Sequence, residues 1–562
     1  MRVADYIANF LHSKGVEYVF MQVGGGSIYL NDGVACCDGL TEIGVKNEAT
    51  APMMAEAYAR LRGGIGAVYV TTGPGGTNAV TGVAEAWVDS APVIIISGQA
   101  EKRFTSFQSE VKGVRTFGCQ ELDIVGVVKS ITKYATMVKD PTSIKWHLEK
   151  AYHMAITGRP GPVWLDIPID IQSAIIDEKS LDSFTPKSSC LDVKEDSIEQ
   201  VVCMLKRSKR PLVIIGQGIR QGDAIEDLKD FINRSEIPVI SSRLGQDILP
   251  FNYKYYCGHG GTKGSIATAE IMREADLVIS LGSRLAVSFV GHDLDAFDKC
   301  ASIVSVDIEK AELLKDGIHI DVPIHGDAKD FLSKLNYKLK STFGLSDSFN
   351  YSVWAEKCIE KKKSKSLVFS SKKSNPIDLY HFVSKIDELS NDRHIFVSDA
   401  GSSYFVCGQS LSFNNSRREI TSGAFASMGL AIPLSIGCCA SDNSIQVLAV
   451  TGDGSLETNI QELKTLSTYG FDAKIFVINN GGYVSIRNTQ DKLFGGRYIN
   501  SDQVETNEIL DFFKVADTFG VKYFLIDDFC KIEEVFKKVT SFRGPALVEV
   551  VCDNKQKIVN CY

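Results

Sequence analysis

Residues 447–457 read Val-Leu-Ala-Val-Thr-Gly-Asp-Gly-Ser-Leu-Glu, a short apolar run followed at once by a glycine turn. An apolar run of this length, bounded by Gly and Asp, is typical of a strand buried on both faces of a parallel sheet. The residues that follow, Glu457–Tyr469, have helical spacing. A strand, a glycine turn and a helix N-terminus present free backbone N–H groups and a positive dipole end, which favour a bound phosphate. This stretch predicts an α/β fold with an anion site at the turn.

A second polar turn, Asn479-Asn480-Gly481-Gly482, ends the next predicted strand, Ile475–Asn479, and Asn480 follows Asp453 by 27 positions. Adjacent parallel strands end on the same crevice, so Asp453 and Asn480 can share one divalent cation that bridges a diphosphate. Mg²⁺ is the natural cation because it accepts carboxylate, amide, carbonyl, water and phosphate oxygens. A glycine-aspartate turn alone also occurs for purely conformational reasons. The paired Asn turn at this spacing favours the binding site.

Apolar runs of the same kind recur along the chain and alternate with helical patterns such as Ala49–Leu61 and Ser197–Arg207. The runs are Tyr18–Val23, Ala67–Thr72, Val93–Ser97, Val163–Ile167, Leu212–Gly216, Leu277–Leu281, Ile303–Asp307, Ile395–Ser398, Val447–Thr451, Ile475–Asn479 and Ala546–Val551. Repeated strand-helix units predict doubly wound parallel sheets. With 562 residues and about 150 residues per domain, the chain is long enough for three or four domains.

Two composition shifts predict the domain boundaries. Residues 174–196 mix Asp, Glu, Lys, Ser and Pro, and residues 346–376 contain two basic runs, Glu360–Lys365 and Ser370–Ser374. Both stretches are interpreted as surface linkers, and basic runs of this kind are usually solvated. The predicted domains are residues 1–173, 197–345 and 375–562.

Composition excludes several classes of protein. The net charge of -8 argues against a nucleic-acid binder. The first segment, Met1–Phe20, contains Asp5 and Lys14 and lacks the apolar core of a signal peptide. No apolar run approaches the length of about 20 that spans a bilayer, so we expect a cytoplasmic protein with no membrane partner. The 14 cysteines lack disulfide or zinc spacing, which predicts reduced and mostly buried thiols.

The chain resembles the thiamine diphosphate enzymes, whose diphosphate motif is a Gly-Asp-Gly turn followed by a paired Asn after a little under thirty residues. Further segments resemble the acetohydroxyacid synthases in all three predicted domains, in the same order. In the first and third domains these are Asn47–Ala51, Thr71–Asn78, Asp89–Pro92, Gly158–Pro162 and Ser422–Gly429. The resemblance implies three doubly wound domains: pyrimidine-binding, central and diphosphate-binding.

The resemblance implies a set of binding and catalytic residues. Thiamine diphosphate is expected to contact Gly24, Glu48, Asn78, Gly401, Ser402, Ser403, Met428, Gly452, Asp453, Gly454, Ser455, Asn480, Gly482 and Tyr483. Asp453, Asn480 and Gly482 are the expected Mg²⁺ ligands. Glu48 matches the acid that hydrogen-bonds the aminopyrimidine ring, Met428 matches the wedge that bends the cofactor, and Gln120 is the third expected catalytic residue. In this family the Glu comes from one subunit and the Gly-Asp-Gly turn from another, so a homodimer or homotetramer is expected.

The predicted central domain contains a weaker signal. A strand leads into Gly216-Gln217-Gly218-Ile219-Arg220-Gln221-Gly222, a glycine turn that can cradle a dinucleotide diphosphate but does not have the GxGxxG spacing. Resemblance to flavin-contacting segments of the synthases implies FAD at Arg159, Gly216, Gly218, Arg284 and Asp307. The alternatives are a central domain whose glycines only turn the chain, and a stand-alone NAD-dependent dehydrogenase, which leaves the other motifs unexplained.

Two positions and one segment depart from the synthases. Ser288 stands where an Arg holds the carboxylate of the second 2-ketoacid, Thr489 stands where a Trp lines the acceptor pocket, and the segment ending at Gln120 is longer. A hydroxyl cannot replace a bidentate Arg-carboxylate contact. Arg487 enters the expected pocket mouth, as a candidate for phosphate contact or as a solvent-facing residue.

These departures favour a carboligase that decarboxylates pyruvate and transfers the two-carbon unit to a large polar carbonyl acceptor. The pattern resembles flavin-containing enzymes of surface-polysaccharide pathways, whose acceptor is a nucleotide-linked 4-ketodeoxysugar. Acetolactate synthase, a decarboxylase, a hydrolase of cyclic diketones and a catalytically silent regulatory subunit are the alternatives. The chain has no His-His pair, which decarboxylases of this superfamily often use.

Overall fold

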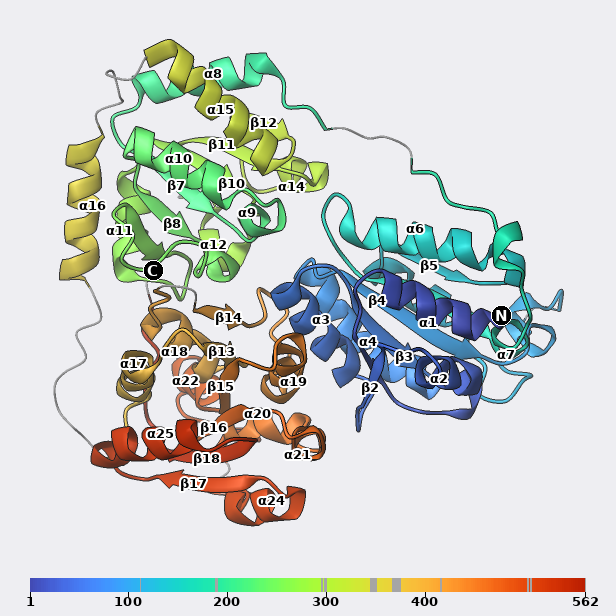
Figure 1. Ribbon diagram of the computed structural model, residues 1–562. Coiled ribbons are helices and arrows are strands. Elements are labelled where there is room, and N and C mark those ends of the chain that lie inside the picture. The colour runs from blue at the N-terminus through green and yellow to red at the C-terminus, as the bar shows by residue number, and fades with distance from the viewer. Residues whose placement is uncertain are drawn as a thin grey trace.

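The computed structural model describes residues 1–111, 113–186, 191–294, 297, 301–343, 351–365, 375–414, 417–502, 505 and 508–560. These residues form three domains, each built on a six-stranded parallel sheet with helices on both faces (Figure 1). The predicted doubly wound α/β fold is therefore confirmed. In the described part of the chain, no helix combines the length and apolarity that a membrane crossing requires.

The first sheet has the strand order β2-β1-β3-β4-β6-β5. Its strands are β1 Tyr18–Met21, β2 Thr41–Gly44, β3 Gly66–Val70, β4 Val93–Gln99, β5 Tyr134–Met137 and β6 Val163–Pro168. Alternate strand residues face opposite layers, because side chains of a strand point to its two faces in turn. One layer contains α1 Val3–Ser13, α2 Ile28–Ala35 and α6 Ile144–Ile156. The other contains α3 Thr50–Arg62, α4 Pro74–Val88 and α5 Ile124–Val128.

The central sheet has the order β12-β11-β10-β7-β8-β9. Its strands are β7 Pro211–Ile215, β8 Val239–Ser241, β9 Tyr256–His259, β10 Leu277–Leu281, β11 Ser302–Asp307 and β12 Val322–His325. The apolar clusters on its two faces include α8 Glu195–Arg207, α10 Ile225–Ser235 and α15 Ala328–Phe343 on one side, and α11 Ile266–Glu274, α12 Val287–Val290 and α16 Ser352–Ser364 on the other.

The third sheet has the order β14-β13-β15-β16-β18-β17. Its strands are β13 His394–Ser398, β14 Arg418–Ile420, β15 Gln446–Gly452, β16 Ala473–Asn479, β17 Lys522–Ile526 and β18 Ala546–Val551. Helices α17 Leu379–Leu389, α18 Ser402–Ser410 and α25 Ile532–Ser541 share one apolar cluster. Helices α19 Ala431–Ser441, α21 Glu462–Tyr469 and α24 Phe512–Phe519 share the other, which continues into the first domain through α3.

Two sequence predictions differ from the structure. The helix predicted over 457–469 is two helices, α20 Asp453–Thr458 and α21, because the chain leaves helical geometry at Asn459, whose side chain binds the carbonyl of Gly429. The linker predicted over 346–376 contains α16, which packs on the central domain through Trp354 and the ion pair of Lys361 with Glu270. The helix was not predicted because its many lysines made the segment resemble a solvated linker. The basic run Ser370–Ser374 lies outside the described residues.

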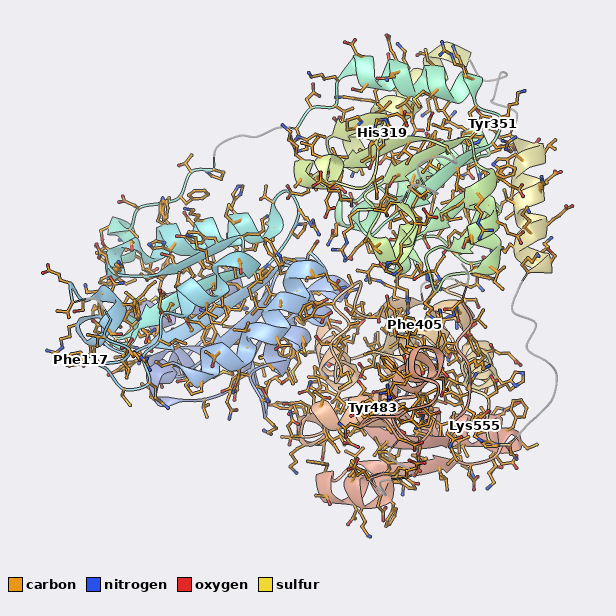
Figure 2. The ribbon with its side chains drawn as sticks, turned by 180° about the vertical axis from the view of Figure 1, so that it is seen from behind. Phe117, His319, Tyr351, Phe405, Tyr483 and Lys555 are labelled. Carbon is orange, nitrogen blue, oxygen red and sulfur yellow. The ribbon has the colours of Figure 1, made fainter. Side chains whose placement is uncertain are left out.

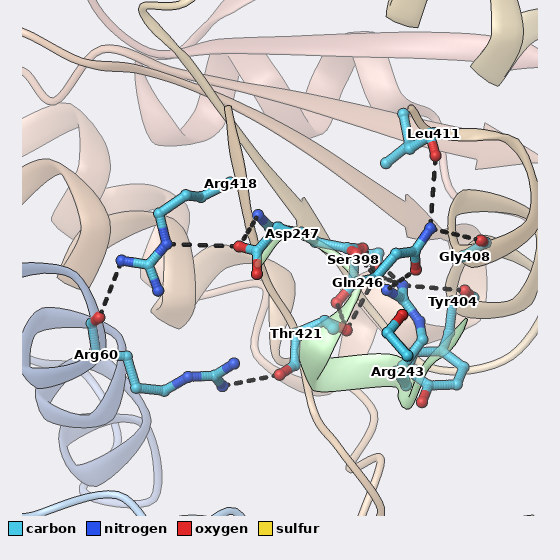
Figure 3. A network of polar contacts seen from close by, with 12 residues as sticks. Arg60, Arg243, Gln246, Asp247, Ser398, Tyr404, Gly408, Leu411, Arg418 and Thr421 are labelled. Carbon is cyan, nitrogen blue, oxygen red and sulfur yellow. Dashed lines mark hydrogen bonds and ion pairs between the residues drawn. The ribbon is translucent and has the colours of Figure 1, made fainter. Parts of the chain in front are cut away.

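The three domains meet in a buried polar network (Figure 3). Arg418 of the third domain donates to Asp247 of the central domain (3.4 Å) and to the carbonyl of Arg60 in the first (3.1 Å). Arg60 in turn donates to the carbonyl of Thr421 (2.8 Å). The network fixes the start of the segment 421–429, which leads to Met428.

Candidate active site

The two predicted metal-binding turns meet at the carboxyl ends of β15 and β16. Asp453 is 3% exposed and begins α20. Its Oδ2 accepts the N–H groups of Asn480 and Gly482, both at 3.0 Å, and its Oδ1 accepts that of Gly454 at 2.8 Å. The carboxylate therefore joins the glycine-aspartate turn to the asparagine turn.

The space over these turns suits a diphosphate with its metal ion. A Cβ added at Gly452 would meet no atom within 4 Å, so the turn is open to a ligand. Gly481 and Gly482 have φ of 76° and 85°, which turns the backbone back toward Asp453. The donors present are a carboxylate, an amide oxygen and a backbone carbonyl, all hard oxygens that suit Mg²⁺. Asp453, Asn480 and Gly482 could hold the metal ion.

Tyr483 and residues 401–403 follow β16 and β13, the two strands on either side of β15. The ring of Tyr483 packs over Gly454, so closely that a Cβ added at Gly454 would lie 2.8 Å from it. Gly401, with φ of 72°, precedes Ser402 and Ser403 at the start of α18. Ser403 is buried and donates to the carbonyl of Ala400, which leaves Ser402 as the more accessible hydroxyl.

Met428 is distant from the glycine-aspartate turn in the sequence, but a hydrogen bond joins its segment to that turn. The N–H of Gly429 donates to Oγ of Ser455 at 2.9 Å, which joins the Met428 segment to the glycine-aspartate turn. Met428 is 41% exposed and Phe425 47% exposed. Apolar side chains held open beside a polar turn are suited to contact the rings of a bound cofactor.

Buried carboxylates of the first domain hold the same segment. Asp89 accepts the N–H of Gly423 at 2.6 Å, and Glu85 accepts the hydroxyl of Ser427 at 2.8 Å. Both side chains are buried. The segment 421–429 is thus positioned by contacts from both domains.

Glu48 and its neighbours lie at the carboxyl edge of the first sheet. Its Oε2 accepts Nδ2–H of Asn78 at 2.9 Å, and its Oε1 lies near the position that a Cβ on Gly75 would take. Gly24 packs against Thr71, and the carbonyl of Gln120 packs against Gly73. Among the described residues, no hydrogen bond or ion pair joins Glu48 to Asp453 or Asn480. The predicted site therefore draws its residues from the first and the third domain.

Glu462 is a site-supporting residue that the sequence analysis missed. This fully buried carboxylate of α21 accepts the N–H groups of Lys46 (2.8 Å) and Asn47 (3.1 Å) and the hydroxyl of Thr50 (3.1 Å). It therefore fixes the loop that carries Glu48. A Glu in an amphipathic helix gives no signal of this role, because its partners are more than 400 positions away in the chain.

A cavity lies where the three domains meet and contains most of the residues predicted to contact FAD. Its lining includes Arg159, Gly218, Arg284 and Asp307, and Phe405 at the junction of the central and third domains (Figure 2). Asp307 ends β11, a position typical of the acid that binds a ribose, and burial raises its pKa. Arg159 is held by Glu312 at 2.8 Å.

The glycines of the central turn have a structural role. A Cβ added at Gly216 would overlap the carbonyl of Gly282. A Cβ added at Gly218 would lie 2.7 Å from the Cα of Gly282. Gly216 is not part of the cavity lining. Gly216 and Gly218 allow two strand ends to approach closely, and Gly218, Gly222 and Gly282 also line the cavity.

The residues that depart from the synthases lie apart from one another. Ser288 is exposed, lines the interdomain cavity, and accepts the N–H of Thr262 through its carbonyl at 2.9 Å. Thr489 is exposed on α22 (Val484–Phe494) and donates to the carbonyl of Ser485. Arg487 differs from both interpretations of the sequence. It is 5% exposed and its guanidinium points to backbone carbonyls, so it is neither a solvent-facing residue nor available to a substrate phosphate.

Comparison with known proteins gives the same division into three parts. Residues 1–118 match the thiamine pyrophosphate enzyme N-terminal TPP binding domain, residues 198–335 the central domain, and residues 399–550 the C-terminal TPP binding domain. Over 99% of the chain and 93% of the relative, the sequence is 31% identical to an acetolactate synthase large subunit of Lactococcus lactis subsp. lactis. It is also 31% identical to acetolactate synthase large subunits of Haemophilus influenzae (92% of the chain, 88% of the relative) and Corynebacterium glutamicum (97% and 85%).

Proposed function

Because the chain belongs to the thiamine pyrophosphate enzyme family, we propose that it is a carboligase that decarboxylates pyruvate and transfers the two-carbon unit to a carbonyl acceptor. The observation that carries the proposal is the Asp453 carboxylate, which joins the two turns that would hold Mg²⁺ and the diphosphate. When bound, thiamine diphosphate supplies the electron sink that decarboxylation of a 2-ketoacid requires.

The chain's own residues would bind the metal ion and the cofactor and orient them. Asp453, Asn480 and the carbonyl of Gly482 would hold Mg²⁺. Glu48, oriented by the amide of Asn78, would hold a proton at the pyrimidine ring. Met428 would support the bound cofactor, and Gln120 would face the substrate.

The acceptor is proposed to lack a carboxylate beside its carbonyl. Ser288 replaces the expected Arg, and the whole segment Leu285–Val290 carries no cation to bind one. The acceptor class that we propose is a nucleotide-linked 4-ketodeoxysugar, which has no carboxylate beside its carbonyl. Because Arg487 is buried, the phosphates of such an acceptor would need another partner.

Acetolactate synthesis, with a second pyruvate as acceptor, is the other candidate. The names of the relatives favour it, since they match nearly the whole chain at 31% identity. The interdomain cavity is proposed to take FAD in either case, with Arg159, Arg284 and Asp307 as contacts.

Mass spectrometry of the products from labelled pyruvate separates these functions. The protein is incubated with thiamine diphosphate, Mg²⁺ and FAD, with and without a nucleotide-linked 4-ketodeoxysugar. A sugar that gains one two-carbon unit, with little acetolactate in its absence, is the expected result. Abundant acetolactate in both samples would identify an acetolactate synthase, and acetaldehyde alone a decarboxylase.

A further inference from the structure

Arg487 is a buried cation beside the asparagine turn of the candidate metal site, and its guanidinium donates to four backbone carbonyls. Its Nη2 donates to the carbonyls of Asn480 (2.9 Å) and Asn554 (3.0 Å), and its Nη1 to those of Gly481 (2.5 Å) and Ser501 (3.3 Å). A guanidinium presents a fixed planar set of donors, so one Arg can bind carbonyls from several chain segments at once. A buried cation bound in this way sets the relative positions of those segments.

The asparagine turn is held from two sides. The N–H groups of Asn480 and Gly482 donate to the carboxylate of Asp453, while the carbonyls of Asn480 and Gly481 accept from Arg487. The peptide units of the turn are therefore fixed between an anion and a cation. This arrangement determines where the side chain of Asn480 and the carbonyl of Gly482 point.

Arg487 also joins the turn to two segments that follow it in the chain. These segments contain Ser501 and Asn554, and α22 makes further contacts with them: Gln490 donates to the carbonyl of Ile499, and Asn488 to that of Gln556. The inward face of α22 thus connects the metal-binding turn to both segments.

We propose that Arg487 is a positioning residue that sets the affinity of the site for its divalent cation by fixing the asparagine turn. The proposal rests on the proposed thiamine diphosphate and Mg²⁺ site. Residues that orient metal ligands from outside the coordination sphere typically contribute a factor of about 10 to 100 in metal affinity. Loss of the guanidinium should therefore weaken metal binding by about this factor.

The test measures Mn²⁺ binding by electron paramagnetic resonance at saturating thiamine diphosphate, for the wild type, Arg487→Lys and Arg487→Met. Arg487→Met is expected to bind Mn²⁺ about 10 to 100 times more weakly. Arg487→Lys is expected to be intermediate, since one ammonium keeps the charge but cannot reach all four carbonyls. The rate at saturating Mn²⁺ should recover more than the rate at limiting Mn²⁺.

Arg417→Lys is the matched control. Arg417 lies in the same domain, is 7% exposed, and also donates to backbone carbonyls, those of Asp387 and Ser412, away from the metal turn. It should leave Mn²⁺ affinity unchanged even if it lowers the thermal midpoint. Should Arg487→Met not fold, Arg487→Lys decides the question. Equal Mn²⁺ affinity in the wild type and Arg487→Lys overturns the proposal, whereas a wild type that binds no Mn²⁺ with thiamine diphosphate overturns the proposed function instead.

Discussion

At the scale of single residues, the candidate site depends on carboxylates whose hydrogen bonds are already made. Asp453 accepts three backbone N–H groups, and charge-assisted bonds of this kind are among the stronger ones in proteins. Glu462 accepts two backbone N–H groups from the loop before Glu48. Each carboxylate fixes a backbone turn, so the geometry around the ligand exists before the ligand binds.

Glu48→Gln should abolish turnover while thiamine diphosphate still binds. The amide keeps the size of the side chain and its contact with Asn78 but cannot hold a proton as the carboxyl group does. We expect the turnover number to fall at least about 100-fold, within the range of general acid–base contributions. Steady-state kinetics and calorimetric cofactor titration check this, with exposed Glu199→Gln as the control. Full activity in Glu48→Gln would remove Glu48 from the site.

Glu56 makes the stability of the domain junction dependent on pH. Burial, together with the nearby carboxylates Asp89 and Glu85, raises its pKa to about 8, although Arg60 lies 2.9 Å away. The folded protein therefore holds a proton that the unfolded chain releases near the ordinary pKa of 4.5. Stability from this group falls as the pH rises between these two values and is constant above them.

Glu56→Gln should remove this dependence. Its amide keeps an acceptor for Arg60 and is never charged, so the variant should gain stability relative to the wild type as the pH rises from about 5 to 8. Thermal midpoints measured across this range check the prediction. A difference between the two proteins that does not change with pH would mean that Glu56 is ionised throughout.

At the scale of elements, the contact between α3 and α19 joins the first and third domains. The two helices belong to one apolar cluster. A Cβ added at Gly437 of α19 would overlap the carbonyl of Met54 and lie 2.9 Å from the Cβ of Ala57. Their backbones therefore touch, and only glycine allows this distance.

Gly437→Ala should force these helices apart. Overpacking of this kind costs about 1–3 kcal/mol, which should lower the thermal midpoint. Gly452→Ala is the matched control, because its Cβ meets no atom within 4 Å and its φ is -77°. Without cofactor the control should melt like the wild type. Equal midpoints for both variants would contradict the close helix contact.

At the scale of the whole molecule, the predicted site draws residues from two domains of the chain. Glu48 belongs to the first domain and Asp453 to the third, and no described hydrogen bond or ion pair joins them. Exposed apolar side chains in the two domains include Val23, which precedes Gly24, Met428 of the predicted site, and Ile486, which follows Tyr483 on α22. Exposed apolar surface beside half-sites is typical of a subunit interface, so we propose a homodimer or homotetramer with sites shared between chains.

Mixing two inactive variants tests the shared site. Glu48→Gln and Asp453→Asn each damage one half, and a mixed dimer contains one site with both halves intact. After denaturation and refolding together, random pairing should restore about a quarter of the wild-type activity, because half of the dimers are mixed and each has one intact site of two. Each variant refolded alone is the control. No recovery, with mixed dimers present by native mass spectrometry, would place the whole site in one chain.

The strands were predictable where they are central and buried. All apolar runs identified in the sequence are strands, because a strand covered on both faces must be apolar throughout. Most strands that were missed lie at sheet edges, such as β2 and β5, whose residues are partly exposed and lack an apolar run. The edge strand β17 is also partly exposed, although its residues 523–526 form a short apolar run. The remaining interior one, β8, has only three residues.

The sequence by itself determined the fold class and the pairing of Asp453 with Asn480, because both depend on strand ends that periodicity and glycine turns locate. Only the tertiary structure decided what Arg487, Glu462 and Gly437 do. Their partners are carbonyls, N–H groups and helix backbones, which every residue carries and which leave no mark in the sequence. Such contacts form only when segments distant in the sequence pack together, so the folded structure alone determines them.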